Sequence, residues 1–235
     1  MRLFYTPDII NDALLPEEES KHAIKVLRLS IGDHINCVDG IGNLFKCSIK
    51  AISGKKVELI IHEQISEYNK PIAQLHIAIA PTKSIDRFEW FLEKATEIGI
   101  SEITPLICFH SERRILKLER LEKVLIAAMK QTLTSYKPTL NQPVEFNDFL
   151  STSSGNKYIA HCENPKNKLS DVLVPKEPST ILIGPEGDFS KEEIDAAILN
   201  GYKPISLGSR RLRTETAGLV ACHTAQLIQS NYSTT

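Results

Sequence analysis

Glycines and charged residues gather in three short segments in the second half of the chain, each directly after an apolar run. The segments cover residues 161–165, 184–189 and 207–217. Glycines let a backbone approach a ligand closely, and the start of a following helix offers free N–H groups. Because ligands of open α/β sheets bind outside the carboxyl ends of the strands, we expect these segments to line one pocket.

The turn Gly184-Pro185-Glu186-Gly187 has two interpretations. It lacks the glycine and lysine spacing of a phosphate-binding loop, and it also lacks the spacing of a dinucleotide fingerprint. Taken alone, the turn is more typical of a tight connection between a strand and a helix, in which Glu186 is only a partner of the helix dipole. A functional role for this turn therefore depends on the other two segments.

Arg213 and Glu215 stand beside the predicted start of the last helix. In a purely structural interpretation, Thr214 or Thr216 caps that helix. An arginine near a helix N-terminus is electrostatically unfavourable, however, and a bound anion would balance its charge. Both interpretations remain open from the residues alone.

Residues 1–68 are rich in short strands separated by turns, which is typical of a small barrel or sandwich. The predicted strands are 34–38, 44–49 and 57–61, and one helix is predicted at 17–27. The polar segment 65–71 ends in a proline, and we interpret it as a linker between two domains.

The second domain, residues 73–235, alternates strands with helices and is predicted to form a mainly parallel α/β sheet. Ser190 and Glu193 predict a capping box, whereas Asp86 and Glu89 only resemble a capping arrangement. Trp90 is expected among the core positions of its helix. The predicted strands are 75–80, 103–107, 158–161, 180–183 and 205–207, and the predicted helices are 86–98, 116–132, 191–200 and 216–229.

The 235 residues carry a net charge of −1, so the overall charge does not indicate a nucleic-acid partner. Basic residues nevertheless cluster between positions 110 and 137 and again at Arg210, Arg211 and Arg213. Such clusters either contact phosphates or form a solvated helix surface. The absence of a long apolar run argues against a membrane span and a secretion signal. Five scattered cysteines argue against disulfides and a zinc site, which favours a cytoplasmic location.

Several motifs, in order along nearly the whole chain, resemble the ribosomal RNA small subunit methyltransferase E family of the SPOUT superfamily. Members of this family methylate N3 of a uridine in 16S rRNA. The C-terminal motifs that carry the resemblance are Ile183-Gly184-Pro185-Glu186-Gly187, Leu207-Gly208 and Leu212-Arg213-Thr214-Glu215-Thr216-Ala217. Further likeness lies in Arg2-Leu3-Phe4-Tyr5, His22, Val26-Leu27-Arg28, Asp39-Gly40, Lys83, Glu97-Ile98-Gly99 and Ser111-Glu112-Arg113.

The resemblance implies an α/β protein with two domains. Residues 1–68 would form a PUA-like β-barrel that helps to hold RNA, and residues 73–235 would form a SPOUT domain with a deep trefoil knot. S-adenosyl-L-methionine would be the cofactor, with no metal and no membrane partner. The protein would be a homodimer. Because a neutral protein lacks the charge to bind bare RNA tightly, we expect its substrate to be 16S rRNA within the assembled small subunit.

The resemblance also implies roles for individual residues. The residues expected at the cofactor are His161, Leu182, Ile183, Gly184, Pro185, Glu186, Gly187, Leu207, Gly208, Leu212, Arg213, Thr214 and Thr216. Those expected on RNA are Arg2, Arg28, Lys83, Arg113, Arg114 and Lys137. Arg213 is the candidate for stabilising the developing uracil anion, because a guanidinium can donate two hydrogen bonds to a carbonyl edge. Glu215 or Glu186 would orient Arg213 or take the N3 proton, and the sequence does not choose between them.

The sequence departs from the family pattern at the end of the 116–132 helix. Lys130 stands where many relatives have an acid, and Thr134 stands where they have an arginine. Nearby Lys137 is a candidate replacement for that positive charge. Two rival functions remain: an RNA-binding module without activity, and a methyltransferase acting on another base or on a ribose 2′-hydroxyl. A small-molecule hydrolase is disfavoured because the chain has no Gly-x-Ser-x-Gly motif.

Overall fold

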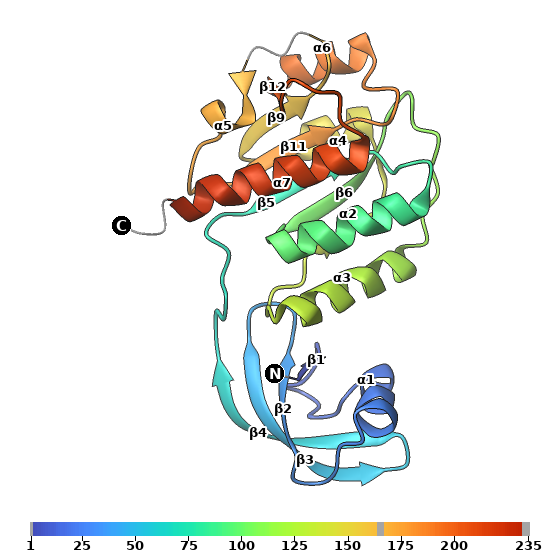
Figure 1. Ribbon diagram of the computed structural model, residues 1–235, viewed down its shortest axis with the longest axis vertical. Helices are drawn as coiled ribbons and strands as arrows, with labels where there is room; N and C mark the ends of the chain where they lie inside the picture. The colour runs from blue at the N-terminus through green and yellow to red at the C-terminus, as the bar shows by residue number, and fades with distance from the viewer. Residues whose placement is uncertain (1, 164–166, 232–235) are drawn as a thin grey trace. The chain divides into compact units, whose positions relative to one another are not determined.

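The computed structural model describes residues 2–163 and 167–231, which divide into two compact units (Figure 1). The N-terminal unit comprises the chain up to Lys70 together with Ile126–Lys137. The C-terminal unit comprises Pro71–Leu125 and the chain from Pro138 onward. Each unit has its own hydrophobic core.

The N-terminal unit contains a four-stranded sheet in the order β1 (Leu3–Tyr5), β2 (His34–Val38), β3 (Leu44–Ser53) and β4 (Lys56–Ile65). β1 pairs with β2 in parallel, and the other two pairings are antiparallel. The strands predicted at 34–38, 44–49 and 57–61 are confirmed, and β3 and β4 extend beyond them. β1 was not predicted, since three residues are too few to display an alternating pattern.

The helix predicted at 17–27 changes its winding halfway along. Glu17–Lys21 is α-helical (α1), but His22–Val26 is a π-helical turn (η1), in which the Leu27 N–H donates to the His22 carbonyl at 3.0 Å. Arg28 then adopts a left-handed conformation with φ +53°. π-turns and left-handed residues other than glycine are both uncommon, and sequence periodicity does not reveal them.

The C-terminal unit is built on an eight-stranded sheet in which every pairing is parallel, as predicted. The strand order is β10 (Asn167–Lys168), β12 (Lys203–Ser206), β9 (Asn156–Ala160), β11 (Ser179–Ile183), β5 (Leu75–Ile79), β6 (Glu102–Ile107) and β7 (Thr139–Leu140), and β8 (Val144–Glu145) also pairs with β6. The helices are α2 (Ile85–Ile98), α3 (Leu118–Thr132), α4 (Phe146–Thr152), α5 (Leu169–Val172), α6 (Lys191–Leu199) and α7 (Thr214–Asn231).

Helices cover both faces of this sheet, which explains why the central strands β5, β6 and β11 are almost entirely buried. Along β11, Ile181 and Ile183 point to a core shared with α2 and α7, and Leu182 points to a second core shared with α4 and α6. Figure 1 shows α2 and α7 side by side on one face. All five residues of β11 are buried.

Gly218 allows α7 to pack closely on the sheet. A Cβ atom at this position would lie 2.7 Å from the Phe91 ring and 2.8 Å from Cδ1 of Ile79, so any side chain would push the helix away. Because α7 begins only four residues earlier, this contact also fixes the position of Arg213 and Glu215.

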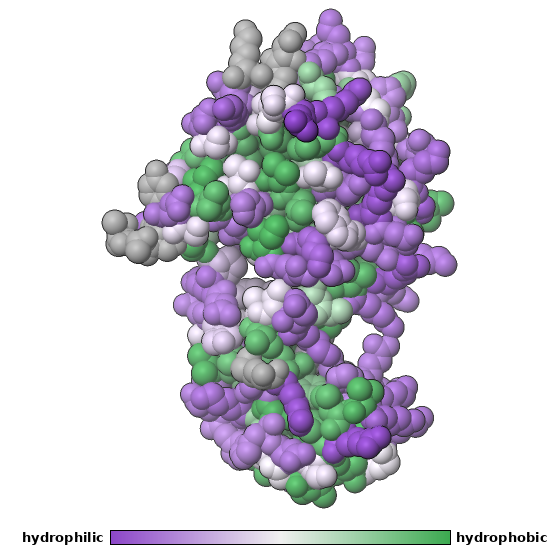
Figure 2. Space-filling view, in the orientation of Figure 1, coloured by the Kyte–Doolittle hydropathy of each residue, from purple (hydrophilic) through white to green (hydrophobic). Residues whose placement is uncertain are grey.

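Several predicted details of the helices are wrong. α7 begins at Thr214, two residues before the predicted start, because the Ala217 N–H already donates to the Arg213 carbonyl. Ser84, which makes no side-chain capping bond, is the N-cap of α2, and Glu89 instead binds Arg120. Trp90 is 41% exposed and not part of the core. Figure 2 shows apolar atoms among polar ones at the surface over α2 and α7.

The capping box predicted for α6 is confirmed, with Ser190 and Glu193 bonding reciprocally to each other's backbone. Such a box satisfies two of the N–H groups that a helix start leaves without partners. The helix therefore begins at a fixed residue, directly after the 184–189 turn.

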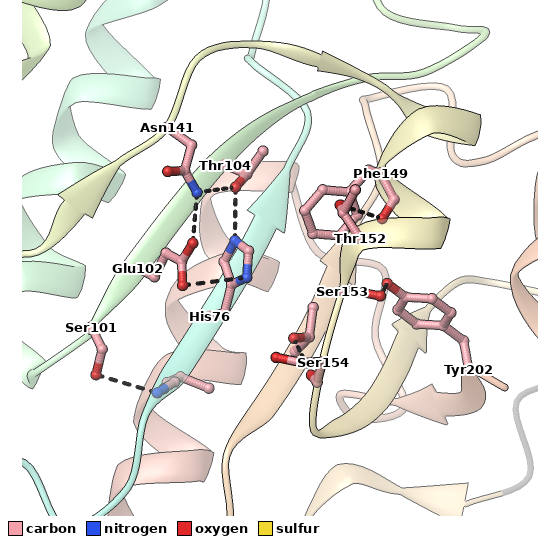
Figure 3. Close-up of polar contacts among 12 residues, drawn as sticks. His76, Ser101, Glu102, Thr104, Asn141, Phe149, Thr152, Ser153, Ser154 and Tyr202 are labelled. Carbon is pink, nitrogen blue, oxygen red and sulfur yellow. Dashed lines mark hydrogen bonds and ion pairs between the residues drawn. The ribbon is translucent and has the colours of Figure 1, made fainter. Parts of the chain in front are cut away.

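A polar cluster lies near the amino ends of β5 and β6 (Figure 3). Nε2 of His76 and Oγ1 of Thr104 are 2.7 Å apart, and the Asn141 amide donates to both Thr104 and Glu102, at 2.8 and 2.7 Å. Burial lowers the pKa of His76, while the Glu102 carboxylate partly opposes that shift. Each of these side chains has a partner, so the cluster forms a closed network.

Candidate active site at the carboxyl ends of the strands

The segments that follow β9, β11 and β12 come together in the structure. The Cys162 N–H, after β9, donates to Oδ2 of Asp188, after β11, at 2.8 Å. A pocket of about 510 Å³ is lined by residues of all three segments, including Gly187 and Arg211. Asn164 and Pro165, which were part of the first predicted segment, lie outside the described residues.

Two further loops, after β5 and β6, complete this edge of the sheet. The Lys83 N–H donates to Oε1 of Glu186 at 2.9 Å, which ties the loop after β5 to the glycine turn. The Arg113 guanidinium donates to the carbonyls of Thr82 and Lys83, at 3.1 and 2.7 Å. Nδ1 of His110 lies 3.0 Å from the carbonyl oxygen of Asp188. Hydrogen bonds thus connect the loops after β5, β6, β9 and β11, and Arg211 of the loop after β12 lines the same pocket.

His161 lies at the end of β9 with both ring nitrogens buried and without hydrogen-bond partners in the described part of the chain. Burial lowers the pKa of this imidazole by disfavouring its charged form, and the carboxylates of Asp188 and Glu163 partly oppose the shift. A buried ring without partners carries a desolvation penalty that a bound ligand can relieve.

Glu215 in the first turn of α7 is a second buried group of this kind. Its Oε2 atom has no hydrogen-bond partner among the described residues, and its Oε1 atom lies 3.9 Å from Nε of Arg87. The helix N-terminus favours its negative charge. Arg213, two residues earlier, is exposed to solvent. The functional interpretation of this segment is therefore supported by an incompletely satisfied carboxylate two residues from an accessible guanidinium.

The other residues expected at the cofactor lie in the same region. Leu182, Ile183, Gly184 and Pro185 are buried at the end of β11, while Glu186 and Gly187 are exposed. Leu207 and Gly208 directly follow β12, and Leu212, Thr214 and Thr216 lead into α7. All of them belong to the C-terminal unit.

The residues expected on RNA are divided between the two units. Arg2 and Arg28 are exposed in the N-terminal unit, to which Lys137 also belongs. In the C-terminal unit, Arg114 forms an ion pair with Glu145 at 2.8 Å, and Lys83 pairs with Glu112 at the same distance.

Lys130, where the sequence departs from the family pattern, has a defined partner. Its Nζ atom contacts both carboxylate oxygens of Glu19, at 2.6 and 2.8 Å, in a largely buried ion pair within the N-terminal unit. The departure therefore serves the packing of this unit.

Sequence reasoning missed Phe109 and His110, which line the pocket, whereas Asp188 lies in the predicted 184–189 segment. The carboxyl end of β6 carried the available signal, because the predicted sheet is parallel and the loop after β6 must emerge at the same edge. Among the described residues, no group of three or more histidine, cysteine or acidic side chains could hold a metal ion. No helix in the same part of the chain is long and apolar enough to span a membrane.

Comparison with known proteins identifies the family of this chain. A family model described as an RNA methyltransferase domain matches residues 68–226, and one described as an RNA methyltransferase PUA domain matches residues 15–61. The ribosomal RNA small subunit methyltransferase E of Rickettsia conorii is 30% identical, over 92% of this chain and 90% of that protein. This chain belongs to the ribosomal RNA small subunit methyltransferase E family. It is a methyltransferase, and its N-terminal unit is PUA-like.

Solved structures of the methyltransferase family superpose over the whole length. A chain from Porphyromonas gingivalis, named a probable rRNA-methyltransferase, has a TM-score of 0.94 and 39% identity, with 99% of this chain and 100% of that chain covered. The ribosomal RNA small subunit methyltransferase E of Neisseria gonorrhoeae has a TM-score of 0.85 and 27% identity, with 97% of each chain covered. That protein was crystallised with bound S-adenosyl methionine.

Proposed function

We propose that this methyltransferase transfers a methyl group from S-adenosyl-L-methionine to N3 of one uridine in 16S rRNA, within the assembled small ribosomal subunit. The observation that carries the proposal is the meeting of the 161–163, 184–189 and 207–217 segments at one edge of the sheet. Two of these segments also carry buried polar atoms without partners in the described structure, on His161 and Glu215. The choice of uracil N3 rests on the family resemblance of the motifs in these segments.

The residues present fit a methyl donor of this kind. The two ring nitrogens of His161 and Oε2 of Glu215 are buried polar atoms that a ligand with hydrogen-bonding groups would satisfy. When bound, the donor supplies a sulfonium methyl group to an attacking nucleophile. Residues 182–187 and 207–212 would hold it through backbone groups, as they would in other members of the family.

Arg213 would stabilise the uracil anion. Removing the N3 proton leaves negative charge on the uracil ring and its two carbonyl oxygens, and a guanidinium can donate to such an edge. Arg213 is exposed at the start of α7, so a base that has left its stack could approach it.

Glu215 is the stronger candidate for orienting Arg213 or accepting the N3 proton. Glu186 already accepts a hydrogen bond from the Lys83 backbone, which anchors the glycine turn. Glu215 is buried and keeps one oxygen without a partner in the described structure. We therefore assign the loop-anchoring role to Glu186 and the chemical role to Glu215.

The remaining features of the proposal concern architecture. Residues 1–68 would close into a PUA-like barrel that holds RNA through Arg2 and Arg28, and the C-terminal unit would be knotted through its cofactor loops. A homodimer would cover exposed apolar residues of α2 and α7, such as Trp90 and Leu227. The protein would act in the cytoplasm, where ribosomal subunits mature.

Mass spectrometry of nucleosides from 16S rRNA tests the proposed function. A strain that lacks the gene should lose one N3-methyluridine, and the wild-type gene should restore it. Arg213→Ala should reduce turnover by about 10²-fold or more, since it removes a group that stabilises charge in the transition state. Its affinity for S-adenosyl-L-methionine should change little. Lys203→Ala, an exposed cation at the start of β12, is the matched control and should behave as wild type. Methylation of another base or of a ribose would contradict the proposal.

A further inference from the structure

Phe109, in the loop after β6, is fixed in place although its side chain is 76% exposed. Its N–H donates to Oε1 of Glu193 at 2.7 Å. Its ring meets the ring of His110 edge to face, with centroids 4.9 Å apart and planes at 77°. Single exposed apolar side chains are common at protein surfaces. Phe109 is distinguished among those of the described residues because it lines the pocket, which the others do not.

His110 connects this aromatic pair to the glycine turn. Because a carbonyl oxygen only accepts hydrogen bonds, Nδ1 of His110 carries a hydrogen and donates it to the Asp188 carbonyl at 3.0 Å. A Cβ atom on Gly187 would lie 3.1 Å from Cβ of His110, so the histidine packs directly against the glycine backbone. Gly187 is thus small because His110 lies against it.

The pocket beside Phe109 combines exposed aromatic rings with charged side chains. Its volume of about 510 Å³ falls within the range of small-ligand sites, which is roughly 300–1,000 Å³. Besides Phe109 and His110, its lining includes the cations Arg211 and Lys191 and the carboxylates of Glu163, Asp188 and Glu192. The Asp188 carboxylate already accepts hydrogen bonds from the N–H groups of Cys162 and Phe189. Proteins bind unpaired nucleotides by stacking bases on aromatic rings and meeting phosphates with cations.

We propose that Phe109 stacks on a nucleobase of the RNA substrate, that His110 positions its ring, and that Arg211 and Lys191 meet the adjoining phosphates. This inference rests on the proposed function and adds the residues that receive the RNA. The other candidate for the same ring is the adenine of the methyl donor. A Phe109→Ala variant distinguishes an RNA base from the donor adenine. Its affinity for the donor should fall only if the adenine stacks on Phe109.

The test compares Phe109→Ala, Phe109→Trp and the control Leu199→Ala, which shortens another exposed apolar side chain of the same unit. Kinetics use small ribosomal subunits from the deletion strain, and calorimetry measures the Kd for S-adenosyl-L-methionine. Phe109→Ala should raise KM for subunits by about tenfold, the order expected for loss of one stacked base. Phe109→Trp and Leu199→Ala should retain a KM near that of wild type, and all donor Kd values should agree.

His110 requires a separate variant pair, because it acts through Phe109. His110→Ala should also raise KM for subunits while leaving donor Kd unchanged. His110→Asn should restore KM, since its amide can still donate to the Asp188 carbonyl. A purely structural role would instead lower Tm in His110→Ala and leave KM unaffected below the transition.

Two results would overturn the inference: an unchanged KM for subunits in Phe109→Ala, or a weakened donor Kd with KM unchanged. Failure of the proposed function gives a different result, in which wild-type enzyme places its methyl group on another nucleotide. The KM ratio between Phe109→Ala and wild type still tests the stacking role on that RNA.

Discussion

The two edges of the C-terminal sheet both contain a partly buried histidine, but only one of them leaves its ring nitrogens without partners in the described structure. At the amino edge, His76 bonds with Thr104 in a network that includes Glu102 and Asn141 (Figure 3). At the carboxyl edge, both ring nitrogens of His161 lack a hydrogen-bond partner within the described structure. Burial lowers the pKa of both histidines.

The comparison shows that a shifted pKa does not by itself identify an active site. Desolvation acts on any buried imidazole, whether its role is structural or chemical. What separates the two edges is the balance of hydrogen bonds, which is complete around His76 and incomplete around His161. Incomplete satisfaction of buried polar groups is the better guide to where a ligand binds.

Replacing the carboxylate of Glu215 or of Glu102 by an amide should give the largest difference in kcat between the two edges. Glu215→Gln should lower kcat by about 10²-fold or more, because proton transfer and charge orientation typically contribute at least that much. Glu102→Gln, the matched change at the amino edge, should leave kcat unchanged. Both are measured by single-turnover methylation of deletion-strain subunits. Equal losses in the two variants would show that the edges do not differ in function.

Changing the histidines should have a smaller effect, on donor affinity. His161→Ala should raise the Kd for S-adenosyl-L-methionine by about tenfold, the effect of losing one buried hydrogen bond to a charged ligand. His76→Gln should leave that Kd as in wild type, because its network lies at the other edge. Isothermal titration calorimetry measures both constants, and a normal Kd for His161→Ala would remove His161 from the donor site.

The smallest expected effect is the pH dependence of stability. His76 has a pKa below its usual 6.5 in the folded protein, so the unfolded chain binds protons first as the pH falls. Stability should therefore decline as the pH drops through about 6.5 and below. His76→Gln should show a shallower decline in Tm over this range. Part of the decline should persist because the pKa of His161 is lowered as well. Parallel Tm curves for the variant and wild type would contradict this contribution.

Sequence reasoning succeeded where the determinants are local or periodic. The parallel sheet follows from the alternation of apolar strands with amphipathic helices, and the α6 capping box follows from Ser190 and Glu193 alone. The turn at 184–187 could be placed at the end of a strand because it directly follows the apolar run 180–183.

Tertiary contacts explain what the sequence could not predict. Lys130 stands out in the sequence only as a departure from the family pattern, because its partner Glu19 lies 111 positions away. Phe109 has no periodicity that marks it as exposed, and its fixed position depends on Glu193 in a distant helix. Trp90 was assigned to the core because its helix carries an apolar stripe, yet Phe88, Phe91 and Leu92 fill that face.

The carboxylate of Glu193 links two events that are far apart in the synthesis of the chain. One of its oxygens accepts the Ser190 N–H at the start of α6, and the other accepts the N–H of Phe109, which leaves the ribosome 84 residues earlier. The loop after β6 therefore lacks this anchor until α6 has been made and has begun to wind. A nascent chain that stops before Glu193 can form much of the sheet, but it lacks the hydrogen bond that holds the backbone of Phe109 at the pocket.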